Sequence, residues 1–451
     1  MRKTIILLLL ICLPTFIFGM GEPDEQLQEI TYDIFELTDF QDHWIITGIT
    51  STGRLKSMID IPKSVNGKPV IAISDEAFSD CYNMTDIKIP DSIFYIGEKA
   101  FSGCEKLTSV IIPNSVEEIG NGAFEECSSL QKVILSDKIE AIKEDTFSGC
   151  SKLTSIIIPN SVTEIGNNAF SMCLSLNTIN IPADVQSIGD GAFAFCIKLK
   201  SITVDKNNRS FSAKNGILFS KDKSQFIAFP GGKKGTVVIS KEITDIKESA
   251  LLGCLRISKV KVEKGNNHYC SRDGILYTKD MSRFIFSPSE IKGEKGIITI
   301  PEGVVSISEG AFFWCDNITR ITVPESVTSI GDYSFDCGNL VAIDVSNNNR
   351  FFSSDDGILF NKDKTEIIRC PAGKKGDVVI PESVEKIGKG AFENCENISS
   401  ITLLTTSPPK IGRKAFTHFD RWTSIKVPYT ALQVYKNEPG WKIYSKYIAG
   451  Y

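Results

Sequence analysis

The stretch Cys104-Glu-Lys-Leu107-Thr-Ser-Val110-Ile-Ile112-Pro113-Asn-Ser-Val116-Glu-Glu-Ile119-Gly120-Asn-Gly-Ala123-Phe124-Glu-Glu-Cys127 decides how this chain folds. The pattern recurs on both sides of it, so that six cysteines follow one another at intervals of 23 residues. These are Cys81, Cys104, Cys127, Cys150, Cys173 and Cys196. A fixed period of about 20–50 residues is typical of a solenoid. The sequence therefore predicts a stack of coils rather than several globular domains.

Each part of the repeat has a predicted structural role. Leu107–Ile112 alternates toward its end and predicts a short strand, which Pro113 ends because proline lacks a backbone donor. Ser115–Ile119 is a second short apolar segment, and Gly120 is expected to make a bend in a conformation that other residues resist. We expect Asn121–Cys127 to form one helical turn, with its phenylalanine and cysteine on one face.

Stacking such coils produces ladders of identical side chains, which we expect to be core. The phenylalanine ladder comprises Phe78, Phe101, Phe124, Phe147, Phe170, Phe193, Phe312, Phe335, Phe392 and Phe416, with Leu251 as its one departure. Cys254, Cys315, Cys337 and Cys395 extend the cysteine ladder. The coil spacing of about 4.8 Å would allow disulfides between neighbouring cysteines. We favour reduced, buried thiols, because free cysteine is among the most buried residue types.

Composition and termini narrow the class of protein. Apolar content of 42% is ordinary for a folded chain, and a net charge of −5 argues against a nucleic-acid partner. The basic start Met1–Lys3, the apolar run Ile5–Phe18 and the small residues after it predict a secretory signal peptide over residues 1–20. That run is too short to span a membrane, and no later segment is long enough. We expect an exported protein without a transmembrane span.

The pattern Cys-x-x-Leu-x-x-Ile-x-Ile-Pro-x-Ser-Val-x-x-Ile-Gly-x-x-Ala-Phe-x-x-Cys resembles the BspA-like, Treponema-type leucine-rich repeat. The resemblance covers about residues 60 to 427, and the end segments 31–70 and 427–441 resemble the caps of that family. The expected fold class is an α/β-type solenoid: a right-handed coil stack with a parallel strand sheet, short helical turns, β-hairpin inserts and terminal caps. The expected domains are a signal peptide (1–20), an N-terminal cap (21–60), the repeats (61–427) and a C-terminal cap (428–451).

Three related inserts, near residues 205–238, 263–298 and 344–379, break the period. Each contains a motif such as Asn215–Phe219, then a charged turn and a second apolar run. Two runs joined by a short polar turn predict a β-hairpin. Two inserts carry polar clusters, Asp205–Asn208 and Ser346–Asn349, which suit either a calcium ion or a turn. We favour the turn, because no bidentate glutamate follows at the required spacing.

The sequence offers no catalytic arrangement. His43, His268 and His418 are the only histidines and lie far apart in a one-dimensional fold. No nucleophile–base pair, metal-ligand spacing or phosphate loop is present, and the cysteines repeat singly. We predict a non-enzyme without cofactor or metal.

One column of residues is predicted to face outward on successive strands. Alternation places Ile111, Ile134 and Ile157 there, followed by Asn180 and Thr203. After the first insert the column continues with polar residues, namely Lys261, Thr322, Asp344 and Thr402. An exposed apolar stripe is typical of an interaction site, although isoleucine also suits strands in general. We hypothesise that these five residues bind a ligand.

The resemblance implies a surface or secreted adhesin, outer-membrane associated or released, that contacts matrix proteins such as fibronectin or fibrinogen, host cells or other bacteria. The alternative is a structural or scaffolding component of the cell envelope. A carbohydrate-binding role ranks last, since it would require exposed aromatic residues in the outward column, which has none.

Overall fold

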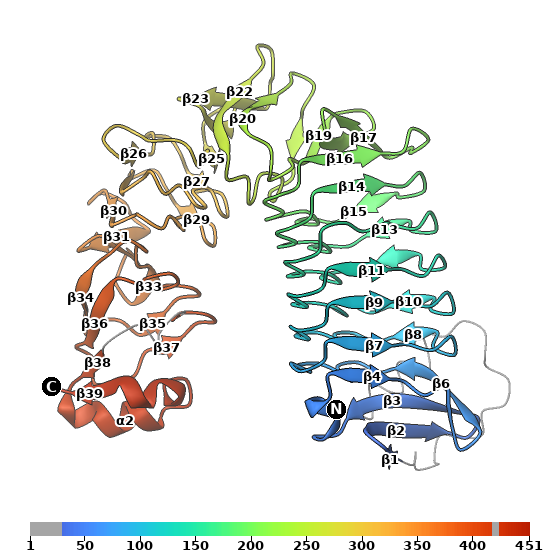
Figure 1. Ribbon diagram of the computed structural model, residues 1–451. Helices are drawn as coiled ribbons and strands as arrows, with labels where there is room; N and C mark the ends of the chain where they lie inside the picture. Colours follow the sequence, from blue (N-terminus) through green and yellow to red (C-terminus); the bar gives the residue numbers. More distant parts are fainter. Residues whose placement is uncertain (1–28, 417–423) are drawn as a thin grey trace, which may run out of the picture. The chain divides into compact units, whose positions relative to one another are not determined.

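The computed structural model describes residues 29–416 and 424–451, so the predicted signal peptide lies outside the described residues. The chain divides into two compact units, Met1–Gly232 and Lys233–Tyr451, and each is described by itself. Both are β-solenoids with a parallel strand in most coils (Figure 1). None of the helices in the described residues is both long enough and apolar enough to cross a bilayer.

The first unit opens with an antiparallel β-meander that covers the first coil. Its strands are β1 (Glu29–Tyr32), β2 (Phe35–Phe40) and β3 (His43–Ile49), followed by η1 (Gly53–Leu55). Strand β3 then pairs in parallel with β6 (Lys68–Ile73), which also pairs with β5 (Ser64–Val65). This meander completes the hydrogen bonding of a strand edge that the first coil would otherwise expose.

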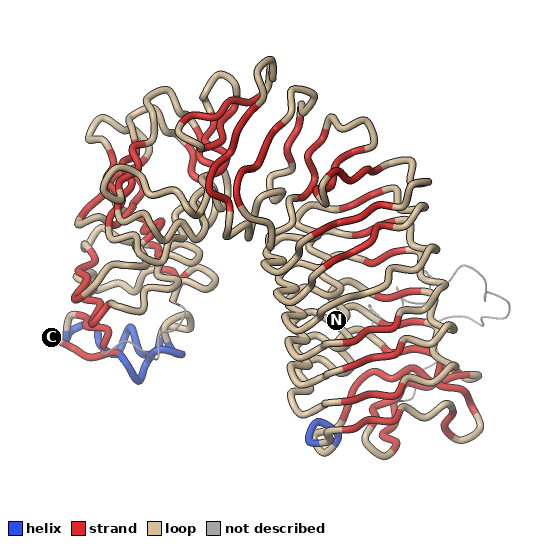
Figure 2. The backbone as a smooth tube through the Cα atoms, turned by 45° about the horizontal axis from the view of Figure 1, so that its top comes forward, coloured by secondary structure: helices blue, strands red, loops and turns tan. Residues whose placement is uncertain are grey.

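Two ladders of short parallel strands then run along the first unit. One contains β4 (Met58–Asp60), β7 (Asp86–Lys88), β9 (Ser109–Ile111), β11 (Lys132–Ile134), β14 (Thr178–Ile181) and β16 (Ser201–Val204). The other contains β8 (Tyr95–Ile96), β10 (Glu118–Ile119), β12 (Ala141–Ile142), β13 (Glu164–Ile165) and β15 (Ser187–Ile188). From β7 onward, the strands that pair within these ladders do so at offsets of 23 residues, as between Ile111 and Ile134, whereas β4 pairs with β7 at an offset of 28. Figure 2 shows these strands in red, joined by tan turns.

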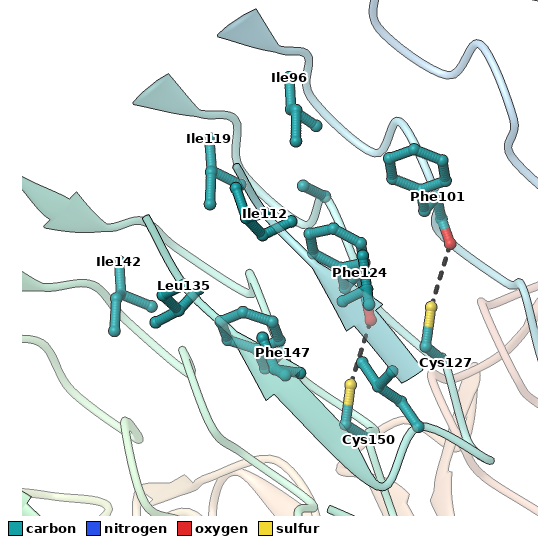
Figure 3. Packing of buried hydrophobic residues seen from close by; sticks show 14 of the residues in the cluster. Ile96, Phe101, Ile112, Ile119, Phe124, Cys127, Leu135, Ile142, Phe147 and Cys150 are labelled. Carbon is teal, nitrogen blue, oxygen red and sulfur yellow. Dashed lines mark hydrogen bonds between the residues drawn. The ribbon is translucent and has the colours of Figure 1, made fainter. Parts of the chain in front are cut away.

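The core of the first unit is the predicted ladder. All six cysteines and the phenylalanines Phe101, Phe124, Phe170 and Phe193 are buried. The rings stack with centroids 5.2 to 5.9 Å apart, from Phe78 to Phe193. The six cysteines are free thiols. The Sγ of a ladder cysteine donates to a phenylalanine carbonyl 26 residues earlier, as Cys127 does to Phe101 and Cys150 to Phe124 (Figure 3).

The expected helical turn is instead a chain of tight turns, so the α/β detail of the predicted fold class is not confirmed. Alternate backbone amides bond within the turn, as from Cys104 to the carbonyl of Phe101. The intervening amides bond to the next coil, as from Phe101 to the carbonyl of Ala123. A helix would use every amide internally. Here about half of the backbone amides in the turn bond to the neighbouring coil instead. Residues such as Lys99 also adopt a positive φ, which a helix does not allow.

Gly120 also differs from expectation, because its backbone is not in the positive-φ region, whereas that of Gly122 is. A Cβ on Gly120 would lie 2.4 Å from the backbone nitrogen of Glu98 in the preceding coil. The glycine is therefore required by the close approach of two coils rather than by a special bend.

The second unit repeats this architecture with the inserts built in. One ladder contains β20 (Gly235–Ile239), β22 (Ile257–Val262), β26 (Ile297–Thr299), β28 (Arg320–Val323), β30 (Ala342–Val345), β34 (Gly376–Ile380), β36 (Ile398–Leu403) and β38 (Ser424–Val427). The other contains β21 (Asp245–Ile246), β27 (Ser306–Ile307), β29 (Ser329–Ile330), β35 (Lys386–Ile387) and β37 (Lys410–Ile411). The unit closes with η3 (Tyr429–Ala431), α2 (Leu432–Asn437), η4 (Lys442–Tyr447) and β39 (Ile448–Gly450).

Each insert contains the predicted hairpin and, before it in the chain, a further strand that the sequence pattern does not predict. The three antiparallel meanders are β17–β18–β19 (Phe211–Lys214, Ile217–Ser220, Gln225–Ala228), β23–β24–β25 (Tyr269–Arg272, Ile275–Thr278, Arg283–Phe286) and β31–β32–β33 (Phe352–Asp355, Ile358–Asn361, Glu366–Arg369). The turn between the first two strands bonds to the preceding coil, as the amide of Ile202 donates to the carbonyl of Gly216. The insert thereby ends one run of parallel strands.

Candidate ligand-binding face

The outward column of the first unit lies where the sequence places it. Within β9 and β11, Val110 and Val133 are buried, whereas their neighbours Ile111 and Ile134 are 61% and 43% exposed. Ile157, one coil further, is 85% exposed. We call these three isoleucines the isoleucine stripe. They form an apolar row on successive coils, and their side chains are not part of the core.

A pair of polar side chains lies at each end of the stripe, and the two members of each pair interact with each other. At one end, the Nζ of Lys88 lies 3.3 Å from the Oδ2 of Asp60, and both side chains are exposed. At the other end, the hydroxyl of Thr203 donates to the Oδ1 of Asn180 over 2.9 Å. The predicted site residues therefore divide into three exposed apolar side chains and a hydrogen-bonded polar pair.

The neighbouring outward column carries short or charged side chains. Its members are Asp86, Ser109, Lys132, Ser155, Thr178 and Ser201. Asp86, Ser109 and Lys132 are aligned by the pairing of β7, β9 and β11. The serines on either side of Lys132 leave the isoleucines protruding, so the face combines an apolar ridge with hydroxyls and one charge of each sign.

In the second unit the outward column is polar with isolated valines. Lys261 is exposed, and Thr322, Asp344 and Thr402 are half-buried. Val238 and Val379, 48% and 56% exposed, pair with Lys261 and Thr402. The 23-residue period does not predict these valines, because they begin the coils after the inserts, where the period is interrupted. No described coil of this unit extends them into a stripe.

The polar clusters of the inserts are hydrogen-bonded turns. The Oδ1 of Asn208 accepts from the amides of Ser210 and Phe211, and its Nδ2 donates to the carbonyls of Pro182 and Val185. Asn266 and Asn349 repeat this arrangement in the other inserts. Both atoms of each amide group are engaged by backbone, which supports the turn over the calcium site. We call these three residues the asparagine clamps.

Groups for covalent or metal chemistry do not gather anywhere in residues 29–416 and 424–451. No three of their histidine, cysteine, aspartate and glutamate side chains are arranged to hold a metal. His43 stacks on Phe40, and its Nδ1 lies 2.6 Å from Asp42. Burial raises the pKa of Cys150 and Cys173 well above the ordinary value, so these thiols are poor nucleophiles.

Coils with stacked parallel strands, tight turns and an internal side-chain ladder define a leucine-rich-repeat solenoid. The model of the BspA-type leucine-rich repeat region matches this chain in six copies, over residues 71–200, 128–234, 282–372 and 372–438. The matches cover more than half of the chain, which therefore belongs to the BspA-type leucine-rich repeat family. The matched model describes a repeat region and indicates no enzymatic family.

Several solved structures are similar to this chain. A leucine-rich cell surface protein from Faecalibacterium prausnitzii is 27% identical, with 89% of this chain and 95% of that one covered and a TM-score of 0.40. A leucine-rich repeat protein of Treponema pallidum is 23% identical over 52% of this chain and 86% of that one, with a TM-score of 0.28. A Bacteroides ovatus leucine-rich repeat protein is 20% identical over 95% and 100%, with a TM-score of 0.31. No curated protein matches.

Proposed function

We propose that this chain is an exported, non-catalytic protein-binding module that acts as a bacterial surface or secreted adhesin. Its ligands are fibronectin- or fibrinogen-like matrix proteins, host cells or other bacteria. Export rests on the signal peptide expected over residues 1–20, and the repeats between the caps (21–60 and 428–451) supply the scaffold. The ligand lies on the isoleucine stripe, flanked by Asn180 and Thr203.

The exposure of Ile157 is the observation that carries the proposal. Strand propensity could account for isoleucine at Ile111 and Ile134, because a branched side chain suits a paired strand. Ile157 lies in a segment, 153–159, that is assigned no strand, and it is the most exposed of the three. Strand propensity gives no reason for a large apolar side chain there, whereas burial by a partner does.

The stripe is the centre of the proposed interface rather than all of it. A stable protein complex buries about 800 Å² on each partner. Three isoleucine side chains supply only part of that area, so the flanking hydroxyls and the charges of Asp86 and Lys132 belong to the rim. Apolar anchors surrounded by polar groups are the usual arrangement of such interfaces.

The test replaces the stripe and measures binding to immobilised fibronectin and fibrinogen. The triple variant Ile111→Ser, Ile134→Ser, Ile157→Ser should bind at least about tenfold more weakly, since each buried isoleucine contributes roughly 1.5–3 kcal/mol. The matched control is Val238→Ser, Ile297→Ser, Val379→Ser, which removes three exposed apolar side chains from the second unit. Unchanged binding by the stripe variant, with an unchanged melting curve, would reject the site.

The location of the protein in the cell distinguishes an adhesin from a structural component of the envelope. An adhesin must be reachable from outside, so protease added to intact cells should remove it. Protection in intact cells, with cleavage only after lysis, would favour an envelope scaffold.

A further inference from the structure

The end of the second unit carries a charge opposite to that of the rest of the chain. Residues 398–451 contain eight lysines and arginines against two acidic residues, a net charge of +6, whereas the whole chain carries −5. Among the described residues of this segment the only acid is Glu438. The basic residues described are Lys410, Arg413, Lys414, Lys426, Lys436, Lys442 and Lys446. Such asymmetry points to an anionic partner.

Six of these seven basic residues, all except Lys446, form no ion pair within the described part of the molecule. Earlier in the same unit, Lys386 and Lys389 form ion pairs of 2.8 Å with Glu366 and Asp332. No ion pair with a described residue forms at the cap lysines Lys436 and Lys442. Lys410, Arg413, Lys414 and Lys426 likewise have none among the described residues. The charge of these six residues is therefore available to a ligand.

Large apolar side chains are exposed among the lysines. Tyr429 and Ile443 are 75% and 73% exposed, and Tyr451 and Val434 are 56% and 52% exposed. These four side chains are not part of the hydrophobic core at this end of the chain, which contains Tyr435, Trp441 and Ile448. The amide of Tyr429 donates to the carbonyl of Tyr451, which brings these two residues together.

The short helix η4 presents both kinds of side chain on one side. Residues three apart eclipse one another in a 3₁₀ helix. Ile443 and Lys446 have this spacing, and both are exposed. Lysine can extend its ammonium to the aqueous layer while its methylenes lie against apolar surface. This arrangement suits an interface between charged headgroups and hydrocarbon.

We propose that the C-terminal cap, residues 428–451, binds the surface of an anionic phospholipid membrane. The lysines contact headgroup phosphates, and Ile443 and Tyr429 enter the interfacial layer. A soluble polyanion would account for the lysines but would gain nothing from the exposed isoleucine and tyrosines. With a six-residue helix α2, the cap lies on the membrane and does not span it. This proposal is independent of the isoleucine stripe.

The experiment uses the full chain and sedimentation with vesicles. Vesicles of 30% phosphatidylglycerol in phosphatidylcholine, roughly −30 to −50 mV at the surface, should bind it, and pure phosphatidylcholine should not. The variant Lys436→Gln, Lys442→Gln, Lys446→Gln should partition on the order of 100-fold more weakly, because each lysine near an anionic surface contributes about fivefold. Ile443→Ser should weaken binding about tenfold.

The matched control, Lys206→Gln, Lys261→Gln, Lys264→Gln, changes net charge equally at three exposed lysines outside the cap. Its binding should stay within about twofold of wild type. An equal loss in the control, or no binding to the anionic vesicles, overturns the proposal. So does polyphosphate binding as tight as vesicle binding together with no effect of Ile443→Ser, which would indicate a soluble polyanion instead.

Discussion

The Sγ of Cys127 donates a hydrogen bond to the carbonyl oxygen of Phe101, 3.2 Å away in the preceding coil (Figure 3). The same oxygen accepts the amide of Cys104 within its own turn. The thiols of Cys104, Cys127, Cys150, Cys173 and Cys196 each bond in this way to the turn of the preceding coil. A thiol can donate this bond only while it is protonated. The cysteine period, which on the sequence alone suits either disulfides or packing, belongs here to packing and coil-to-coil bonding.

The protonation of these thiols should make stability fall at alkaline pH. A thiol in the unfolded chain ionises near pH 8.5. Burial raises the pKa of Cys196 to about 12. The stabilisation is complete below the unfolded pKa and is lost as pH rises toward 12, because the unfolded state releases the proton first. In the variant Cys196→Ala, the free energy of unfolding should therefore fall less steeply with pH, by about 1.4 kcal/mol per pH unit.

Urea unfolding of wild type and Cys196→Ala between pH 7 and 10.5, with reductant present, measures this slope. Cys270→Ala is the control, since Cys270 is half-buried and less desolvated. Parallel pH profiles for wild type and Cys196→Ala would show that Cys196 does not titrate differently on unfolding.

Thiol accessibility gives a second prediction. Cys270 is half-exposed, whereas Cys150 and Cys173 are fully buried with strongly raised pKa values. Native protein treated with iodoacetamide at pH 8 should be modified first at Cys270, as followed by peptide mass spectrometry. In 8 M urea all three should react at similar rates. Equal labelling of Cys150 and Cys270 in the native protein would contradict a buried ladder.

The asparagine clamps are expected to stabilise the start of each insert, so replacing one of them should destabilise the protein. Asn208 is 1% exposed, and its amide group makes four hydrogen bonds to backbone. Asn208→Asp replaces the donor by an oxygen that faces two carbonyls, which should cost about 2–4 kcal/mol at neutral pH. Asn207→Asp, at an exposed neighbour, is the matched control and should cost little. Chemical denaturation measures both, and equal losses would refute the clamp.

The repeat made much of the fold predictable, because alternation within 23 residues assigns each side chain a direction. The outward position of Ile111 and the burial of Phe124 follow from that pattern, and both are confirmed. The clamps left a readable signal, an asparagine three residues before an aromatic residue in every insert, as in Asn208 and Phe211. The first strand of each insert meander has no such sequence signal, because a segment such as Phe211–Lys214 is short and polar.

The helical turn predicted around Ala123 and Phe124 does not form, and the reason is physical. Local sequence around Ala123 and Phe124 suits a helical turn, but the carbonyls of the neighbouring coil compete for alternate amides. That competition depends on stacking, which a single repeat does not reveal. The basic character of residues 398–451, by contrast, could have been found by counting charge along the sequence.

A buried ion pair in the second unit supplies the last prediction. Arg369 in β33 donates to Asp336 over 2.7 Å, and their side chains are 7% and 6% exposed. Arg369 also donates to the carbonyl of Gly390. Thirty-three positions separate the two partners, at the coil where the cysteine spacing shortens to 22 between Cys315 and Cys337.

Asp336→Ala should cost about 3–5 kcal/mol, because it leaves a guanidinium buried without its counter-charge. Asp332→Ala breaks the exposed pair with Lys389 and should cost less than about 1 kcal/mol. Replacing both partners, by Arg369→Met with Asp336→Leu, removes the unpaired charge and should lie closer to wild type than Asp336→Ala does. Urea unfolding of the three variants decides the matter. If Asp336→Ala were no more destabilising than Asp332→Ala, water would have to reach Arg369, and the pair would not be holding the insert against its neighbouring coils.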